Sequence, residues 1–83
     1  MDNCVYIEVI FPALNKTYDF ILPYLMKIHI ATKLMANIIM EKEHISVNQN
    51  KLLLFSKDSK ILLNAKKSVY EEGIRDGACL LLI

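Results

Sequence analysis

The sequence has no large excess of charge of either sign, and this limits the partners that can be expected. Ten Lys and Arg residues are balanced by nine Asp and Glu residues, which leaves a net charge of +1 at pH 7. The basic residues form no stripe along the chain. Binding of nucleic acid through neutralised phosphates is therefore not expected.

Long apolar runs and a basic leader are also missing. The uninterrupted apolar runs are far shorter than the roughly 20 residues that span a bilayer. The first four residues carry an acid and no basic residue, unlike the start of a secretory signal peptide. We therefore expect neither a signal peptide nor direct insertion into a membrane.

Cysteine and histidine are scarce and scattered. Cys4 and Cys79 lie at opposite ends of the chain, and His29 and His44 lie between them. A metal site needs at least three converging ligands, and nucleophilic catalysis needs a Cys or Ser within reach of a positioned base. We expect a reduced, cytoplasmic protein with no metal, no cofactor and no enzymatic activity, in which both thiols pack against neighbours.

What the sequence does contain is a C-terminal apolar run at residues 78–83. A run that is apolar throughout indicates a strand buried on both faces, which belongs at the centre of a sheet. Gly73 suits the end of a short helical turn, and Gly77 suits a tight turn that starts the strand. Ser68 is followed three residues later by a glutamate, as in a helix capping box, and Ile74 is expected to enter the core.

Two more strands are predicted near the N-terminus and joined as a hairpin. Residues 4–11 are rich in β-branched and aromatic residues, and their one charge, Glu8, marks the parity that faces water. Pro12 ends this strand, and residues 17–22 form the next one. The positions expected to face the core are Val5, Ile7 and Val9 in the first strand and Tyr18, Phe20 and Leu22 in the second.

From residue 25 to residue 43 the apolar period changes to 3.6, which predicts a helix that Pro23 can open. The stripe expected to cover the sheet consists of Ile28, Ala31, Leu34, Met35, Ile38 and Ile39. Apolar residues on the opposite side of the helix are either ordinary surface residues or an interaction face. Residues 51–55 predict a third strand, and residues 61–63 predict a short fourth.

This order of elements resembles the ubiquitin-like β-grasp fold. The resemblance depends on residues 17–23, Thr-Tyr-Asp-Phe-Ile-Leu-Pro, before the helix, and on residues 69–77, Val-Tyr-Glu-Glu-Gly-Ile-Arg-Asp-Gly, before the last strand. It implies one α+β domain over residues 1–83, with a mixed sheet of four to five strands and one main helix packed on one face. The C-terminal strand would be central and parallel to the first. Within this fold the chain resembles the YukD/EsaB group associated with type VII (WXG-type) secretion in Gram-positive bacteria.

The resemblance also implies a function. Conjugatable ubiquitin relatives and sulfur carriers end in a flexible Gly-Gly, whereas this sequence has no glycine after Gly77. We therefore expect a non-conjugated protein-binding module, an accessory or regulatory component of a type VII secretion system whose partners are its cytoplasmic parts. The alternatives are a structural ubiquitin-like homodimer and a sulfur-carrier or modifier relative that lacks the Gly-Gly.

A binding surface is expected on the face of the sheet that the helix leaves open. If Leu80 and Leu82 face inward, their neighbours face outward, and the third strand is expected to place Leu53 and Phe55 inward. Other ubiquitin-like proteins use the same face to hold their partners. The exposed apolar patch predicted for protein binding consists of Ile10, Leu52, Leu54, Leu81 and Ile83.

Overall fold

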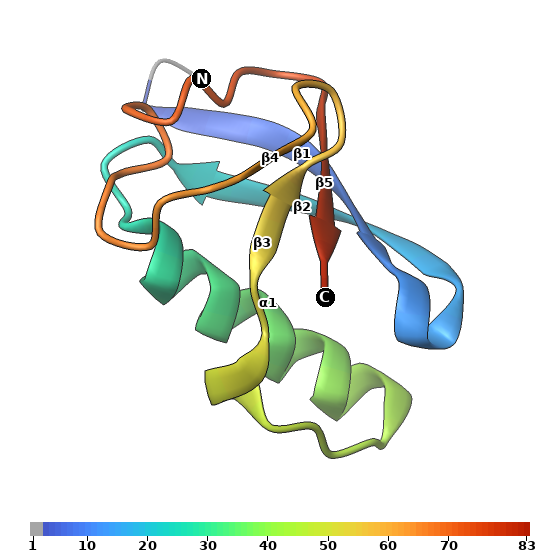
Figure 1. Ribbon diagram of the computed structural model, residues 1–83. Coiled ribbons are helices and arrows are strands. Elements are labelled where there is room, and N and C mark those ends of the chain that lie inside the picture. Colours follow the sequence, from blue (N-terminus) through green and yellow to red (C-terminus); the bar gives the residue numbers. More distant parts are fainter. Residues whose placement is uncertain (1–2) are drawn as a thin grey trace.

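The computed structural model describes residues 3–83 as two layers, a five-stranded sheet and one long helix that covers one of its faces (Figure 1). The helix is α1 (Ile28–Glu43). The strands are β1 (Cys4–Phe11), β2 (Lys16–Pro23), β3 (Leu54–Ser56), β4 (Ile61–Leu62) and β5 (Ala78–Leu82). Their order across the sheet is β2-β1-β5-β3-β4, with β1 and β5 parallel and the other neighbours antiparallel. The predicted mixed sheet with a central C-terminal strand is confirmed.

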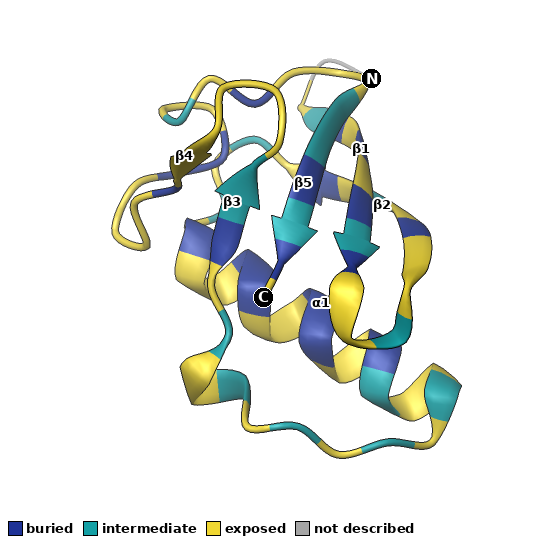
Figure 2. Ribbon diagram, turned by 45° about the vertical axis from the view of Figure 1, so that its right-hand side comes forward, coloured by how far each residue is buried: buried dark blue, intermediate teal, exposed yellow. Residues whose placement is uncertain are grey.

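The β1–β2 hairpin has the face assignment that its sequence predicts; β1 has the predicted bounds, and β2 is one residue longer at each end than the predicted 17–22. Its loop is one turn of 3-10 helix (Pro12–Leu14), closed by Asn15, which adopts the left-handed conformation that asparagine tolerates. Along β1, buried positions alternate with less buried ones (Figure 2). Val5, Ile7 and Val9 have no exposed surface, whereas Glu8 is exposed. Period-two alternation about a single charge was sufficient to assign the face.

The helix begins later than predicted, because Pro23 is the last residue of β2 and does not open α1. Pro23 lies on the edge strand, where its missing N–H removes no ladder bond. Residues 24–27 form the turn into the helix, and the amide of Met26 donates to the carbonyl of Pro23 at 3.2 Å. The predicted start at residue 25 was therefore three residues early.

The face of α1 that packs on the sheet is rotated from the predicted stripe. Leu34 and Ile38 were expected inside but are 41% and 44% exposed, respectively. The buried residues of α1 are Ile28, Ala31, Thr32, Met35, Ala36 and Ile39. Small side chains on this face let the helix lie close to the sheet. The hydroxyl of Thr32 donates to the carbonyl of Ile28 at 2.8 Å, which satisfies it in the core.

A polar cluster ties the C-terminal end of α1 to the start of β2. The phenol of Tyr18 donates to Glu43 Oε2 at 2.8 Å, and Lys16 Nζ pairs with Glu43 Oε1 at 2.7 Å. Burial, followed by the hydrogen bond to Glu43, raises the pKa of Tyr18 to about 12. The hydrogen bond from Lys16, with that from Tyr18, lowers the pKa of Glu43. The last buried residue of α1 is Ile39, so these polar contacts to Glu43 are what fasten the final turn of the helix to β2.

The segment before β5 also behaves as its sequence predicts. The amide of Ser68 donates to Glu71 Oε1 at 2.9 Å, and the amide of Glu71 donates to Ser68 Oγ at 3.1 Å, which completes a capping box. Gly73 and Gly77 both have positive φ, +76° and +86°, where residues with a Cβ are strained. Ile74 between them is buried, as expected.

The register of β3 differs from the prediction. Leu54 pairs with Leu82 and Phe55 pairs with Leu81, and residues directly opposite in an antiparallel pair share a face. Leu54 therefore points inward with Leu82 and is only 2% exposed, while Leu53 is 48% exposed. Leu52 packs against the core on the inner side. The predicted outward positions of Leu52 and Leu54, and the inward positions of Leu53 and Phe55, were wrong.

Candidate protein-binding face

The face of the sheet away from α1 carries a line of side chains that crosses all five strands. The strand registers place Thr17 opposite Ile10, Ile10 opposite Leu81, Leu81 opposite Phe55, and Phe55 opposite Leu62. Because opposed residues share a face, four apolar side chains follow one another across the sheet from β1 to β4.

A second apolar pair extends this line along the strands. Leu53 and Ile83 exchange backbone hydrogen bonds, with the amide of Ile83 donating to the carbonyl of Leu53 at 2.9 Å. Together these side chains form the open-face patch: Ile10, Leu53, Phe55, Leu62, Leu81 and Ile83. Leu53, Leu62 and Ile83 are about half exposed, at 48%, 50% and 47%, and the other three are half-buried.

The structure brings together three of the five residues predicted for binding. Ile10, Leu81 and Ile83 belong to the open-face patch, whereas Leu52 and Leu54 lie on the inner side of the sheet. Sequence reasoning missed Leu53, Phe55 and Leu62. No local signal marks the first two, because residues 52–55 are apolar on both parities and only the pairing of Leu54 with Leu82 turns Leu53 and Phe55 outward.

One border of the open-face patch is acidic. Glu8 lies opposite Asp19 on β2 and opposite Cys79 on β5, and it is two residues before Ile10, on the same face of the strand. The Cys79 Sγ lies 3.8 Å from Glu8 Oε1, and the Cys79 amide donates to Asp58 Oδ2 at 3.2 Å. Burial, with a smaller contribution from Glu8, raises the pKa of the Cys79 thiol. A protonated thiol is a poor nucleophile, and the two neighbouring carboxylates, Glu8 and Asp19, make this border a charged rim of the patch.

Other kinds of site find little support in the described part of the chain. Within residues 3–83 no group of three or more His, Cys, Asp or Glu side chains could hold a metal ion. His29 and His44 are both exposed, and neither lies beside a cysteine in the strand pairing. Over the same residues, α1 and the shorter helical turns are all too short or too polar to cross a membrane. The open-face patch is thus the candidate site, and its chemistry is that of a contact surface.

Of three comparisons with known proteins, the search of solved structures bears on the fold. A scan against protein-family models found no match for this sequence, and a search of curated proteins found none either. Among solved structures, the ubiquitin-like domain of Arabidopsis thaliana protein At2g32350 covers 98% of this chain and 77% of its own, with a TM-score of 0.73 and 15% identity.

Two further solved structures come from secretion proteins. The ubiquitin-like domain of the Mycobacterium tuberculosis type VII secretion system protein ECCD1 has a TM-score of 0.73 and 12% identity over 96% of this chain and 97% of that one. The EccD5 ubiquitin-like domain from Mycobacterium xenopi has a TM-score of 0.72 and 15% identity over 96% of this chain and 92% of that one. These likenesses show that the chain has the ubiquitin-like β-grasp fold.

Proposed function

We propose that the chain is a non-conjugated ubiquitin-like module that binds another protein through the open-face patch. We further propose that it acts in the cytoplasm, as an accessory or regulatory component of a bacterial type VII secretion system. The observation that carries the binding role is the line of four apolar side chains that crosses the sheet in register. Monomeric proteins seldom leave so continuous an apolar surface uncovered.

The secretion pathway is supported by the fold and by the kind of protein that shares it. Two of the similar solved structures are ubiquitin-like domains of type VII secretion proteins, and each is matched over almost its whole length. A domain of this size can bind a large secretion complex without any catalytic activity of its own.

The border of the patch indicates the chemistry of the partner surface. Glu8 and Asp19 lie side by side next to the apolar line, so the matching surface would place apolar side chains at its centre and a basic side chain at one edge. Charges at the rim of an interface raise the association rate and fix orientation, while the dry centre supplies most of the affinity.

The test is a capture experiment with two matched variants. Leu53→Asp combined with Leu62→Asp places charges on exposed positions of the patch, and Ile30→Asp places one on the outer side of α1, where Ile30 is 46% exposed. The tagged wild-type protein, expressed in its native cells, is expected to retain type VII secretion components, identified by mass spectrometry. The patch variant should lose them and the Ile30→Asp control should keep them, because a charge at a dry interface centre is costly.

Two results would contradict the proposal. Capture of the same components by the folded patch variant, checked by circular dichroism, would exclude this surface. Elution of the wild type at twice the monomer mass, reduced to the monomer by the patch variant, would favour the structural homodimer instead.

The absence of conjugation has a structural argument and its own measurement. Leu80 and Leu82 have no exposed surface, so residues 78–82 are held at the centre of the sheet and do not form a flexible tail. Intact-mass spectrometry of protein from native cells is expected to give the unmodified protein and no heavier covalent adduct. A ladder of heavier covalent adducts, or the mass of a thiocarboxylate, would revive the modifier and sulfur-carrier alternatives.

A further inference from the structure

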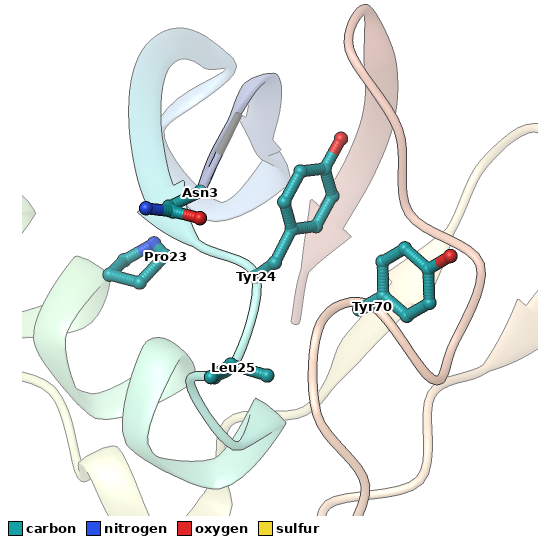
Figure 3. Close-up of a pocket in the computed structure, with 5 residues that line it drawn as sticks. All are labelled: Asn3, Pro23, Tyr24, Leu25 and Tyr70. Atoms are coloured by element: carbon teal, nitrogen blue, oxygen red, sulfur yellow. The ribbon is translucent and has the colours of Figure 1, made fainter. Parts of the chain in front are cut away.

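A pocket of about 630 Å3 lies at the end of β1 that is remote from Ile10, where β2 leads into α1. Its lining consists of Asn3, Pro23, Tyr24, Leu25 and Tyr70. Figure 3 shows Asn3 and Pro23 on one side of Tyr24 and the ring of Tyr70 on the other. Backbone hydrogen bonds hold these segments together, since the amide of Tyr70 donates to the carbonyl of Tyr24 at 2.9 Å and the amide of Tyr24 donates to that of Asn3 at 2.9 Å.

The two tyrosines form a fixed aromatic corner that a guanidinium group completes. Their ring centroids are 5.5 Å apart at an interplanar angle of 85°. The Arg75 Cζ lies 4.0 Å from the Tyr70 centroid and 5.7 Å from the Tyr24 centroid. Arg75 Nη1 also donates to the carbonyl of Ile74 at 2.9 Å and to that of Tyr70 at 3.2 Å. Arg75 is therefore held in place beside the pocket, although it is exposed.

The hydrogen bonds of Arg75 leave one edge of its guanidinium group available. Guanidinium carries five N–H donors, and within residues 3–83 the bonds that it makes all start from Nη1. The edge formed by Nε and Nη2 has the fork geometry that suits a carboxylate. In the same part of the chain the one ion pair within 4.0 Å joins Lys16 and Glu43, so no described carboxylate neutralises Arg75.

Acidic residues close to Arg75 in sequence are engaged elsewhere. Glu71 accepts from the amide of Ser68, and this bond, with that from the Ser68 hydroxyl, lowers the pKa of the Glu71 carboxyl. Glu72 accepts from the amide of Asn64 at 3.3 Å, and Asp76 accepts from the amide of Tyr6 at 2.9 Å. These carboxylates hold turns together, so among residues 3–83 no carboxylate pairs with the cation beside this apolar pocket.

We propose that this pocket binds an acidic peptide segment of another protein. An apolar side chain of the segment packs on Leu25 and the tyrosine rings, and a neighbouring carboxylate pairs with the free edge of Arg75. Leu25 is 85% exposed and Tyr70 is 53% exposed, so the segment would cover apolar surface that nothing in residues 3–83 covers. The pocket carries a basic residue and calls for an acidic segment. The open-face patch has an acidic border and calls for a basic partner surface, so the two proposed occupants differ in charge.

The experiment titrates 15N-labelled protein with blocked synthetic heptapeptides and follows backbone amide shifts. One peptide series has a central Leu, Phe or Trp flanked by Glu, and the matched series replaces each Glu by Gln. Shifts are expected at the amides of Leu25, Tyr70 and Arg75, with the Glu peptides binding about tenfold more tightly than the Gln peptides, a usual size for one charge-assisted pair.

Three variants locate the site. Leu25→Ser should weaken binding of the Glu peptides about tenfold by removing apolar contact. Arg75→Gln should abolish the preference for Glu over Gln peptides. Leu53→Ser, on the open-face patch, should bind like the wild type, so failure of one site would not be mistaken for failure of the other.

Several outcomes would overturn this proposal. The first is the absence of pocket shifts at millimolar concentrations of every Glu peptide. The second is equal affinity for the Glu and Gln peptides of the wild-type protein, a comparison that needs no variant to fold. The third is selective broadening of the pocket amides by phosphatidylglycerol vesicles with no response to any peptide, which would assign the pocket to a lipid surface.

Discussion

Truncation of Leu54 to alanine tests the register that separates the core from the open face. Leu54 is 2% exposed and lies opposite Leu82, which has no exposed surface. Removal of a buried leucine side chain costs about 2–5 kcal/mol, from lost burial and from the cavity left behind. At roughly 0.05–0.15 kcal/mol per residue, a domain of 83 residues has about 4–12 kcal/mol of stability in total. Leu54→Ala should therefore remove a large fraction of it.

The neighbouring leucine supplies the matched control. Leu53 is 48% exposed, so Leu53→Ala should cost about 1 kcal/mol or less. Urea unfolding followed by circular dichroism measures both variants. With an m-value of about 1 kcal/mol per M, Leu54→Ala lowers the midpoint by roughly 2 M or more, while Leu53→Ala lowers it by less than about 1 M. Equal shifts, or a larger shift for Leu53→Ala, would refute the register of β3 and with it the composition of the open-face patch.

Two further predictions concern polar interactions. Ser68→Ala removes the hydroxyl of the capping box and should cost about 1 kcal/mol in the same urea assay; an unchanged midpoint would mean that the turn does not depend on it. The Tyr18 pKa lies above its ordinary value of 10.0, at about 12, so folding favours the protonated phenol. The stability that this supplies is complete below pH 10 and is lost as pH rises toward 12. Tyr18→Phe should accordingly make the alkaline loss of stability shallower across that window, and an identical slope would contradict this account.

The elements with an internal marker of orientation could be predicted from the sequence. In β1 a single charge, Glu8, alternates with β-branched residues and assigns both faces. Before β5, Gly73 and Gly77 indicate the two turns. The apolar residues of β5 that follow indicate a central strand and not one at the edge of the sheet. These signals are local, since each depends on residues within one element, and the packing of the rest of the chain agrees with them.

The elements whose inward faces were predicted wrongly lack such a marker of orientation. The segment Leu52, Leu53, Leu54 and Phe55 is apolar on both parities, so only its partner β5 decides which side faces the core. In α1 the large residues Leu34 and Ile38 suggested a stripe, but Thr32 and Ala36 occupy the inner side because small residues permit close packing on the sheet. The pocket beside Arg75 was not predicted either, since it joins residues more than forty positions apart.

The parallel pairing of β1 with β5 also sets the order in which the fold can be completed during synthesis. β1 and β2 can pair as a hairpin early, but the edge of β1 at residues 7–10 has no partner until residues 78–81 are made. Glu8 and Cys79 are 71 residues apart in sequence, and bringing such distant segments together slows folding. In the meantime an apolar strand edge stays open to strands of other nascent chains. The period between synthesis of the hairpin and synthesis of β5 is therefore when this protein is most prone to aggregate. Removal of β5 would leave two disconnected hairpins, β1–β2 and β3–β4, and not a smaller domain.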